Sequence, residues 1–91
     1  MKELSTEEKT QLRSQARTLF DTLKIGRTGL TDGIVAELRR QLVARQLVKV
    51  RIGVTDRVAL NHLIKQTAEA SKSHHITTTG HTAVFYLPKA S

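Results

Sequence analysis

Cysteine and tryptophan are absent from this sequence, and proline occurs once, at Pro88. The absence of cysteine excludes disulfides, thiol catalysis and cysteine-ligated zinc, and it fits a reducing compartment. No apolar run approaches the roughly 18 residues that a membrane span needs. The N-terminus has neither the apolar core of a secretion signal nor an Arg- and Ser-rich transit pattern. We therefore expect a cytoplasmic protein without a membrane partner.

Aromatic residues are scarce as well, since the sequence contains only Phe20, Phe85 and Tyr86. Phe20 is expected in the core. Phe85 and Tyr86 are neighbours on a predicted strand, so they are expected to face opposite ways. At most one or two rings remain for stacking, which excludes a binding surface built from several aromatic side chains.

The chain has 91 residues, of which 38% are hydrophobic. This length suits one domain with one modest core, and apolar residues at regular spacing indicate a folded chain. We expect a single domain over residues 1–91, without repeats, linkers or low-complexity segments.

Positive charge is concentrated in the middle of the chain. The net charge is +7, from 15 Lys and Arg against 8 Asp and Glu. Residues 1–23 carry four charges of each sign, whereas residues 24–51 carry seven basic and two acidic residues. Such clustering favours a polyanionic partner over a generally basic surface.

A short motif, Gly26-Arg27-Thr28-Gly29, lies within the basic segment. Glycine lacks the Cβ that would keep a nucleic-acid backbone at a distance, and it permits positive φ in a turn. Arg27 offers a guanidinium and Thr28 a hydroxyl to a phosphate. A helix is predicted directly behind, and the N–H groups of its first turn favour an anion. The motif indicates a phosphate clamp, although the same glycines also suit a plain strand-to-helix turn.

Three helices are predicted from apolar spacing and caps. Ser5 and Glu8 form a capping box for the first, a helix of about four turns whose apolar stripe is Leu12, Ala16, Leu19 and Phe20. Thr31 caps the second, with Ile34, Val35, Leu38 and Leu42 on its apolar face. Thr55 or Asp56 caps the third, with Leu60, Leu63, Ile64 and Thr67 on one side.

Basic residues lie outside the apolar faces of two of these helices. Arg39 and Arg40 are more than about 100 degrees from the apolar centre of the second helix, so we expect both to be exposed. Arg13 and Arg17 lie beside the stripe of the first helix. They are expected on a solvated face, where they can make a secondary phosphate contact.

Four strands are predicted by period-two alternation and turn signals. In 21–25, Leu23 and Ile25 face one way and Thr22 and Lys24 the other. In 47–52, Lys49 and Arg51 share the face opposite the apolar residues. Residues 76–79 and 82–87 form a hairpin around Gly80-His81, which suits a type II′ turn, and Pro88 ends its second strand.

The expected fold is therefore α/β, in the order α-β-α-β-α-β-β. A strand-helix-strand unit implies a parallel pair of strands, and the hairpin adds antiparallel pairing. We expect a mixed four-stranded sheet packed with three helices.

Neither catalysis nor metal binding is indicated. No nucleophile is paired with a base, the acidic residues are scattered, and the glycine loop lacks the G-K-[ST] ending of a nucleotide-binding P-loop. His74 and His75 are adjacent on a strand and so face opposite ways, and no carboxylate is near His75 and His81 in sequence. We predict no enzyme activity, no small-molecule substrate, no cofactor and no metal.

Residues 25–34, together with Ala36-Glu37 and 47–52, resemble the CRM domain (chloroplast RNA splicing and ribosome maturation). Its stand-alone prokaryotic members are the YhbY-type proteins. The similarity covers nearly the whole chain, including the capped first helix and the hairpin that ends in an aromatic pair. The chain departs from the family where Leu87 and Pro88 follow the final tyrosine, in place of a basic residue, and where 74–79 is unusually polar.

The resemblance implies a fold like the C-terminal domain of a bacterial initiation factor, with a G-x-x-G loop used as in KH domains to hold a nucleic-acid backbone. It also implies RNA as the partner: precursor large ribosomal subunits for prokaryotic members, and intron RNA for members in plant organelles.

We therefore predict a non-catalytic RNA-binding protein that binds structured ribosomal RNA during maturation of the large subunit. An architectural DNA-binding protein and a protein adaptor stay open as alternatives, because basic charge does not distinguish nucleic acids. The expected RNA-binding residues are Lys24, Gly26, Arg27, Thr28, Gly29, Arg39, Arg40, Lys49 and Arg51.

Overall fold

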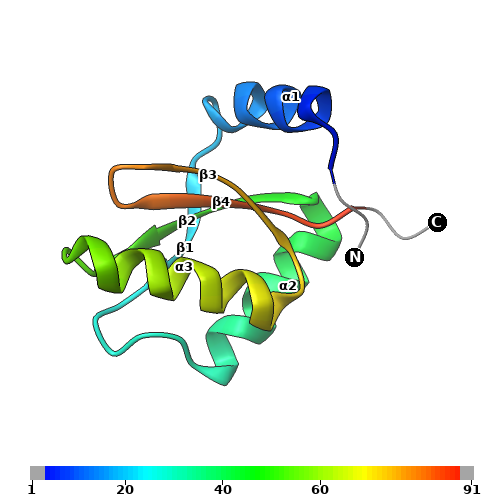
Figure 1. The fold of residues 1–91 in the computed structure, drawn as a ribbon. Helices are drawn as coiled ribbons and strands as arrows, with labels where there is room; N and C mark the ends of the chain where they lie inside the picture. Colours follow the sequence, from blue (N-terminus) through cyan, green and yellow to red (C-terminus); the bar gives the residue numbers. More distant parts are fainter. Residues whose placement is uncertain (1–3, 89–91) are drawn as a thin grey trace.

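The computed structural model describes residues 4–88, and it has the predicted order of helices and strands (Figure 1). The helices are α1 (Thr6–Ala16), α2 (Asp32–Arg45) and α3 (Arg57–Ser71). The strands are β1 (Asp21–Ile25), β2 (Leu47–Ile52), β3 (His74–Thr79) and β4 (Thr82–Tyr86). The expected α/β fold, with three helices and four strands, is confirmed.

The strands form one mixed sheet in the order β1-β2-β4-β3. β1 pairs with β2 in parallel, and β4 pairs antiparallel with both β2 and β3. Because β1 and β2 are parallel they finish at the same end of the sheet, and the pairing of Arg51 with Thr82 brings the hairpin turn to that end too.

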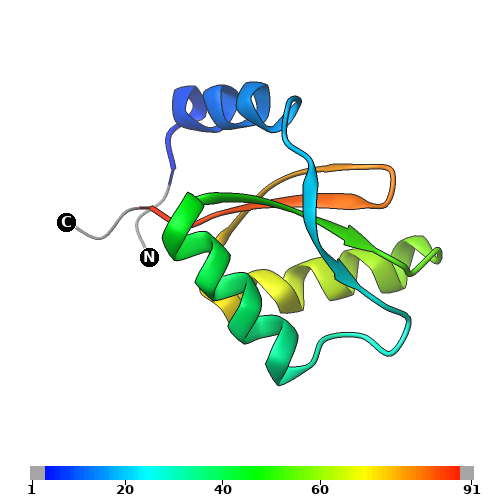
Figure 2. The same cartoon turned by 180° about the vertical axis from the view of Figure 1, so that it is seen from behind.

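Helices cover both faces of the sheet, as Figures 1 and 2 show. α2 and α3 cover one face, where the larger core contains Ile25, Leu38, Val50, Leu60 and Phe85 among its buried residues. α1 lies on the other face over a smaller core of Ala16, Leu47, Ile76 and Val84. The molecule therefore has three layers, with a separate apolar cluster on each side of the sheet.

The predicted caps are present, but α1 is shorter than expected. Ser5 and Glu8 form the capping box, Thr31 caps α2, and Asp56 rather than Thr55 caps α3. The first helix was expected to run for about four turns, yet α1 has 11 residues, or about three turns.

The prediction that Phe20 lies in the core is wrong, because its side chain is 86% exposed. At the end of α1, the N–H groups of Arg17, Thr18 and Leu19 bond to carbonyls three residues back, at 3.2–3.3 Å. This tightening turns successive side chains by about 120 degrees instead of 100. Leu19 therefore still reaches the smaller core, while Phe20 points into solvent.

The hairpin turns at Gly80, where φ is +58°. His81 does not have a positive φ, which agrees with the predicted type II′ turn. β3 begins at His74, two residues before the predicted start, and β4 ends at Tyr86, one residue before the predicted end.

Every helix among residues 4–88 is too short or too polar to cross a membrane.

Candidate nucleic-acid interface

The glycine motif forms an exposed turn between β1 and α2. The Gly29 N–H donates to the Gly26 carbonyl at 3.0 Å, which closes a four-residue turn with Arg27 and Thr28 at its tip. Both tip residues are exposed. The turn is therefore an accessible projection at the end of the sheet, and Arg27 and Thr28 can meet a ligand without rearrangement.

The two glycines of the turn differ in their backbone. Gly29 has φ +87°, a region that favours glycine, whereas Gly26 is not in that region. A Cβ built at either position would have no protein atom within 4 Å. The space above both glycines is thus open to a partner.

A third glycine fixes the base of the loop. The Gly53 N–H donates to the Ile25 carbonyl at 2.8 Å, directly before the turn. A Cβ at Gly53 would lie 3.4 Å from that oxygen and 3.8 Å from the Gly26 Cα. Both distances are ordinary van der Waals contacts, so the ends of β1 and β2 are held together here by the hydrogen bond.

The start of α2 is less suited to an anion than the loop itself. The Thr31 hydroxyl accepts from the Ile34 N–H at 3.2 Å, which satisfies one of the free amides of the first turn. Asp32 adds a carboxylate at the positive end of the helix dipole. Phosphate contacts are consequently expected at the turn of residues 26–29 rather than at the helix terminus.

Three predicted cations share the sheet face on which α1 lies. Lys24 pairs with Arg51 across β1 and β2, and Lys49 is two residues before Arg51 on the same face. Lys24 and Arg51 are exposed and Lys49 is half-buried. Arg51 Nε lies 3.4 Å from Asp21 Oδ2, an exposed ion pair. The structure thus brings Lys24, Lys49 and Arg51 to one face, with Lys24 and Arg51 nearest the loop and Lys49 level with the start of β1.

The prediction that Arg39 is exposed is wrong. The residue is half-buried, and its guanidinium donates to the Ser71 carbonyl at the end of α3. The helical wheel placed Arg39 away from the centre of the apolar face, but it did not show that α3 packs against that side of α2. An RNA contact by Arg39 stays a prediction.

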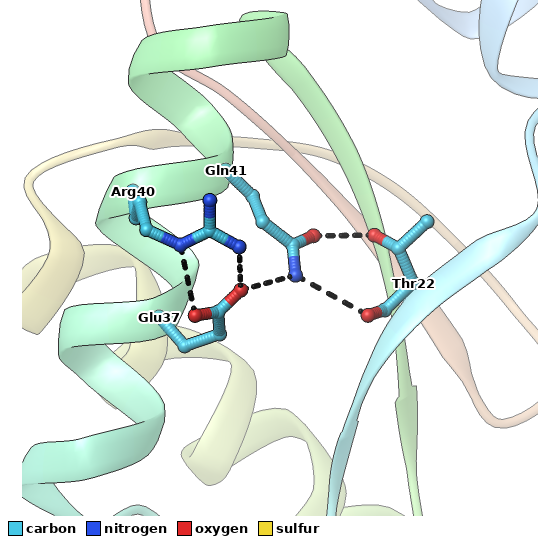
Figure 3. A network of polar contacts seen from close by, with 4 residues as sticks. All are labelled: Thr22, Glu37, Arg40 and Gln41. Atoms are coloured by element: carbon cyan, nitrogen blue, oxygen red, sulfur yellow. Dashed lines mark hydrogen bonds and ion pairs between the residues drawn. The ribbon is translucent and has the colours of Figure 1, made fainter.

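Arg40 is exposed, as predicted, and it is paired within the protein (Figure 3). Its Nε and Nη2 donate to the two carboxylate oxygens of Glu37 at 3.0 and 2.6 Å. The Arg40 side chain and the Gln41 amide lower the pKa of Glu37 to about 2, and Glu37 in turn raises the pKa of Arg40. An RNA contact by Arg40 therefore competes with an existing ion pair.

The same network connects α2 to the edge strand β1 (Figure 3). The Gln41 amide donates to Glu37 at 2.9 Å and to the Thr22 carbonyl at 3.3 Å, and its oxygen accepts from the Thr22 hydroxyl. Strict alternation predicts that Thr22 shares a face with Lys24, but the register shifts between Asp21 and Leu23. That irregularity turns Thr22 toward α2.

The adjacent histidines lie on opposite faces of β3, as expected. The His74 ring is 6.5 Å from the Tyr86 ring, whereas the His75 ring is 5.8 Å from that of Phe85 in the larger core. Burial lowers the pKa of His75, and its Nε2 lies 2.7 Å from the Thr78 hydroxyl. Residues 4–88 contain no cluster of three potential metal ligands.

Comparisons with known proteins agree with the fold. The chain resembles, at 24% identity, the solution structure of the hypothetical protein SAV1595 from Staphylococcus aureus. The TM-score is 0.86, and the match covers 98% of this chain and 93% of the other.

Sequence comparison points to one family. A protein of Haemophilus influenzae named RNA-binding protein is 33% identical over 88 residues, which cover 97% of this chain and 89% of the relative. A protein of Pseudomonas aeruginosa named a probable RNA-binding protein is 31% identical, over 91% of this chain and 80% of the relative. The model of the CRS1/YhbY (CRM) domain matches residues 4–86. The chain therefore belongs to the CRS1/YhbY (CRM) domain family.

Proposed function

We propose that this protein is a non-catalytic RNA-binding module that holds an RNA backbone with the turn of residues 26–29. Lys24, Lys49 and Arg51 add positive charge beside the turn. Arg39 and Arg40 have a smaller part, because each already has a partner within the protein. The names of the relatives from Haemophilus influenzae and Pseudomonas aeruginosa support RNA as the ligand.

One observation carries this proposal: Arg27 and Thr28 are exposed on a turn whose two glycines have open space above them. The turn is held by its own hydrogen bond and by the bond from Gly53 to Ile25. Backbone amides and a guanidinium are thus available to phosphate oxygens before binding, so little ordering is required on association.

The RNA we infer is structured ribosomal RNA of the maturing large subunit, bound in the cytoplasm. The similarity to stand-alone YhbY-type proteins supports this partner. The scarcity of exposed rings supports a structured RNA, because recognition of unpaired bases relies heavily on aromatic stacking. Phosphate contacts then supply most of the affinity and little sequence specificity.

The test compares three variants of the turn: Arg27→Ala, Gly29→Asp and Gly29→Asn. Aspartate and asparagine have similar size and both tolerate positive φ, so this pair differs mainly in charge. We expect Arg27→Ala to weaken binding to a large-subunit RNA fragment about fivefold, as one lost phosphate contact. Gly29→Asp should weaken it more than Gly29→Asn, with equal melting temperatures for the two, measured by filter binding at fixed salt.

The competing functions give different results. Unchanged affinity in Arg27→Ala and Gly29→Asp would favour the protein adaptor, and equal affinity for RNA and for duplex DNA of the same length would favour an architectural DNA-binding protein. Sedimentation of the protein with precursor large subunits, rather than with mature ribosomes, tests the inferred partner.

A further inference from the structure

A hollow of about 400 Å³ lies on the sheet face beneath the C-terminal part of α1. α1 and β2 supply the basic residues of its lining, and the β3–β4 hairpin supplies hydroxyls. Its polar lining consists of Arg13, Arg17, Lys49, Thr77, Thr79 and Thr82.

The hollow exists because α1 meets the sheet here through a small side chain. Ala16 and Val84 are both buried and belong to the smaller core, and both line the hollow. Leu12, one turn earlier on α1, packs against the same core and lines a separate hollow of about 280 Å³. The floor of the hollow under α1 is therefore apolar, and its walls are polar.

The charges around the hollow are all positive. No carboxylate lines it, and Arg13, Arg17 and Lys49 have no ion-pair partner among residues 4–88. The Thr82 hydroxyl donates to the Thr79 carbonyl at 2.8 Å, which leaves the hydroxyls of Thr77 and Thr79 to donate to a bound oxygen. Three cations around one hollow repel each other, and a polyanion relieves that repulsion.

Paired strand residues lead from β1, which precedes the glycine turn, to the hollow. Lys24 pairs with Arg51, and Arg51 pairs with Thr82, so one row of side chains crosses the sheet from β1 to the hollow. The glycine turn follows β1 directly at the same end of the sheet. Figure 1 shows that α1 also points its C-terminus toward this end. An RNA strand that extends from the glycine turn toward the hollow would therefore meet basic or hydroxyl side chains along its path.

An exposed aromatic ring lies at the border of this region. Phe20 and Lys49 line a neighbouring hollow of about 310 Å³, and Lys49 lines both hollows. An 86% exposed phenylalanine contributes little to folding, but its face can stack on a base.

We propose that the hollow under α1 is a second RNA contact: it holds the sugar–phosphate backbone of the RNA bound by the glycine turn, and Phe20 stacks on a base at its border. This inference rests on the proposed function and extends it to a separate layer of the molecule. The ligand chemistry is that of an RNA strand, with phosphates in the hollow and a base outside it.

The first test neutralises the wall of the hollow without altering the turn. In the double variant Arg13→Gln and Arg17→Gln, affinity for the large-subunit RNA fragment should fall about tenfold or more. The slope of log K against log salt should become less steep by roughly 1.5, as for two lost phosphate contacts. The matched control is Arg57→Gln with Lys65→Gln, which removes the same charge from exposed positions on α3, on the opposite side of the sheet. It should bind within twofold of the wild type.

The second test uses the absence of tryptophan from the chain. Phe20→Trp places a single reporter beside the hollow, and Val58→Trp places one at a 76% exposed position on α3. RNA should quench the fluorescence of the tryptophan at position 20 by stacking, with little effect on the tryptophan at position 58.

The outcomes separate this inference from the function on which it rests. If Arg27→Ala weakens binding while the Arg13 and Arg17 double variant binds like the wild type, the hollow is not an RNA contact and the proposed function stands. Equal quenching at positions 20 and 58 also overturns the inference. If the wild-type protein does not bind RNA, both proposals fail together.

Discussion

Gly26 and Gly29 are glycines for different physical reasons. At Gly29 a φ of +87° favours glycine within the protein itself. At Gly26 neither the backbone angle nor a neighbouring atom requires it, because a Cβ would have nothing within 4 Å. The proposed contact with an RNA backbone offers a physical reason for the absence of a side chain at position 26.

This difference predicts that Gly26→Ala separates binding from stability. The free energy of unfolding should stay the same or rise by up to about 1 kcal/mol, because alanine restricts the unfolded chain. RNA affinity should fall several-fold, because the new methyl group occupies the space of the ligand. Thermal unfolding and filter binding measure the two effects. A variant that binds RNA as tightly as the wild type would show that the backbone at residue 26 is not approached.

The low pKa of Glu37 predicts a specific loss of stability in acid. Its value of about 2, against an ordinary 4.5, comes first from the hydrogen bonds of Arg40 and Gln41. A carboxylate with a lowered pKa in the folded state stabilises the fold above pH 4.5, and this contribution is lost as the pH falls toward 2. The Glu37→Gln variant lacks the ionisable group, so its unfolding free energy should decline less over that interval.

Denaturant unfolding at several pH values between 2 and 6 measures this effect. Glu69→Gln is the matched control, because the Glu69 carboxylate is exposed and has no partner among residues 4–88. The control should follow the wild-type curve. Parallel curves for Glu37→Gln and the wild type would show that the network with Arg40 does not persist in solution.

Among the helices, α1 is attached to the sheet by the least burial. Ala16 is its one buried residue, with Leu12 partly buried, whereas α3 has five buried residues. The free energy of local opening follows the apolar surface that a segment buries. α1 should therefore open more readily than α2 and α3.

Hydrogen exchange measures this difference between elements. Amides of α1 should exchange with an opening free energy a few kcal/mol below that of β2 and α3. Leu12→Ala should accelerate exchange in α1 and leave β2 unchanged. Equal protection in α1 and β2 would mean that α1 opens only when the whole domain unfolds.

The elements themselves could be predicted because each carries a local signal. The capping residues Ser5 and Thr31, the alternation in β2 and the glycine at the hairpin turn act over a few residues. Two errors occurred where the backbone departs from the regular geometry that a local pattern assumes. Phe20 keeps the spacing of the α1 stripe, but the helix tightens before it, and Thr22 keeps the alternation of β1 but lies at a register shift.

The candidate site could be predicted only where its residues are close in sequence. The turn of residues 26–29 is one motif, so its place between β1 and α2 could be predicted. The partner of Arg39 is Ser71, 32 residues away, and the hollow joins α1 to the hairpin near the other end of the chain. Such neighbours arise from the packing of helices on the sheet, which periodicity does not specify.

For the molecule as a whole, the candidate interface and the opposite side of the sheet both carry exposed cations, with Arg57 and Lys65 on α3 among the latter. Two acidic residues, Asp21 and Glu37, are paired with Arg51 and Arg40. Six cations lie along the path from the glycine turn to the hollow under α1, with Arg51 partly neutralised: Arg13, Arg17, Lys24, Arg27, Lys49 and Arg51. Because these six cations follow one path, a polyanion that lies along it meets positive charge throughout.

That arrangement predicts a steep salt dependence of RNA binding. Six phosphate contacts correspond to a slope of log K against log salt of roughly −4, which is a loss of about two hundredfold between 50 and 200 mM salt. Arg40→Gln should reduce the slope less than Arg27→Ala, because Glu37 already neutralises Arg40. Binding measured across this salt range tests both statements. A slope near zero would mean that the affinity comes from contacts other than phosphates, since counterion release accompanies every phosphate that a cation neutralises.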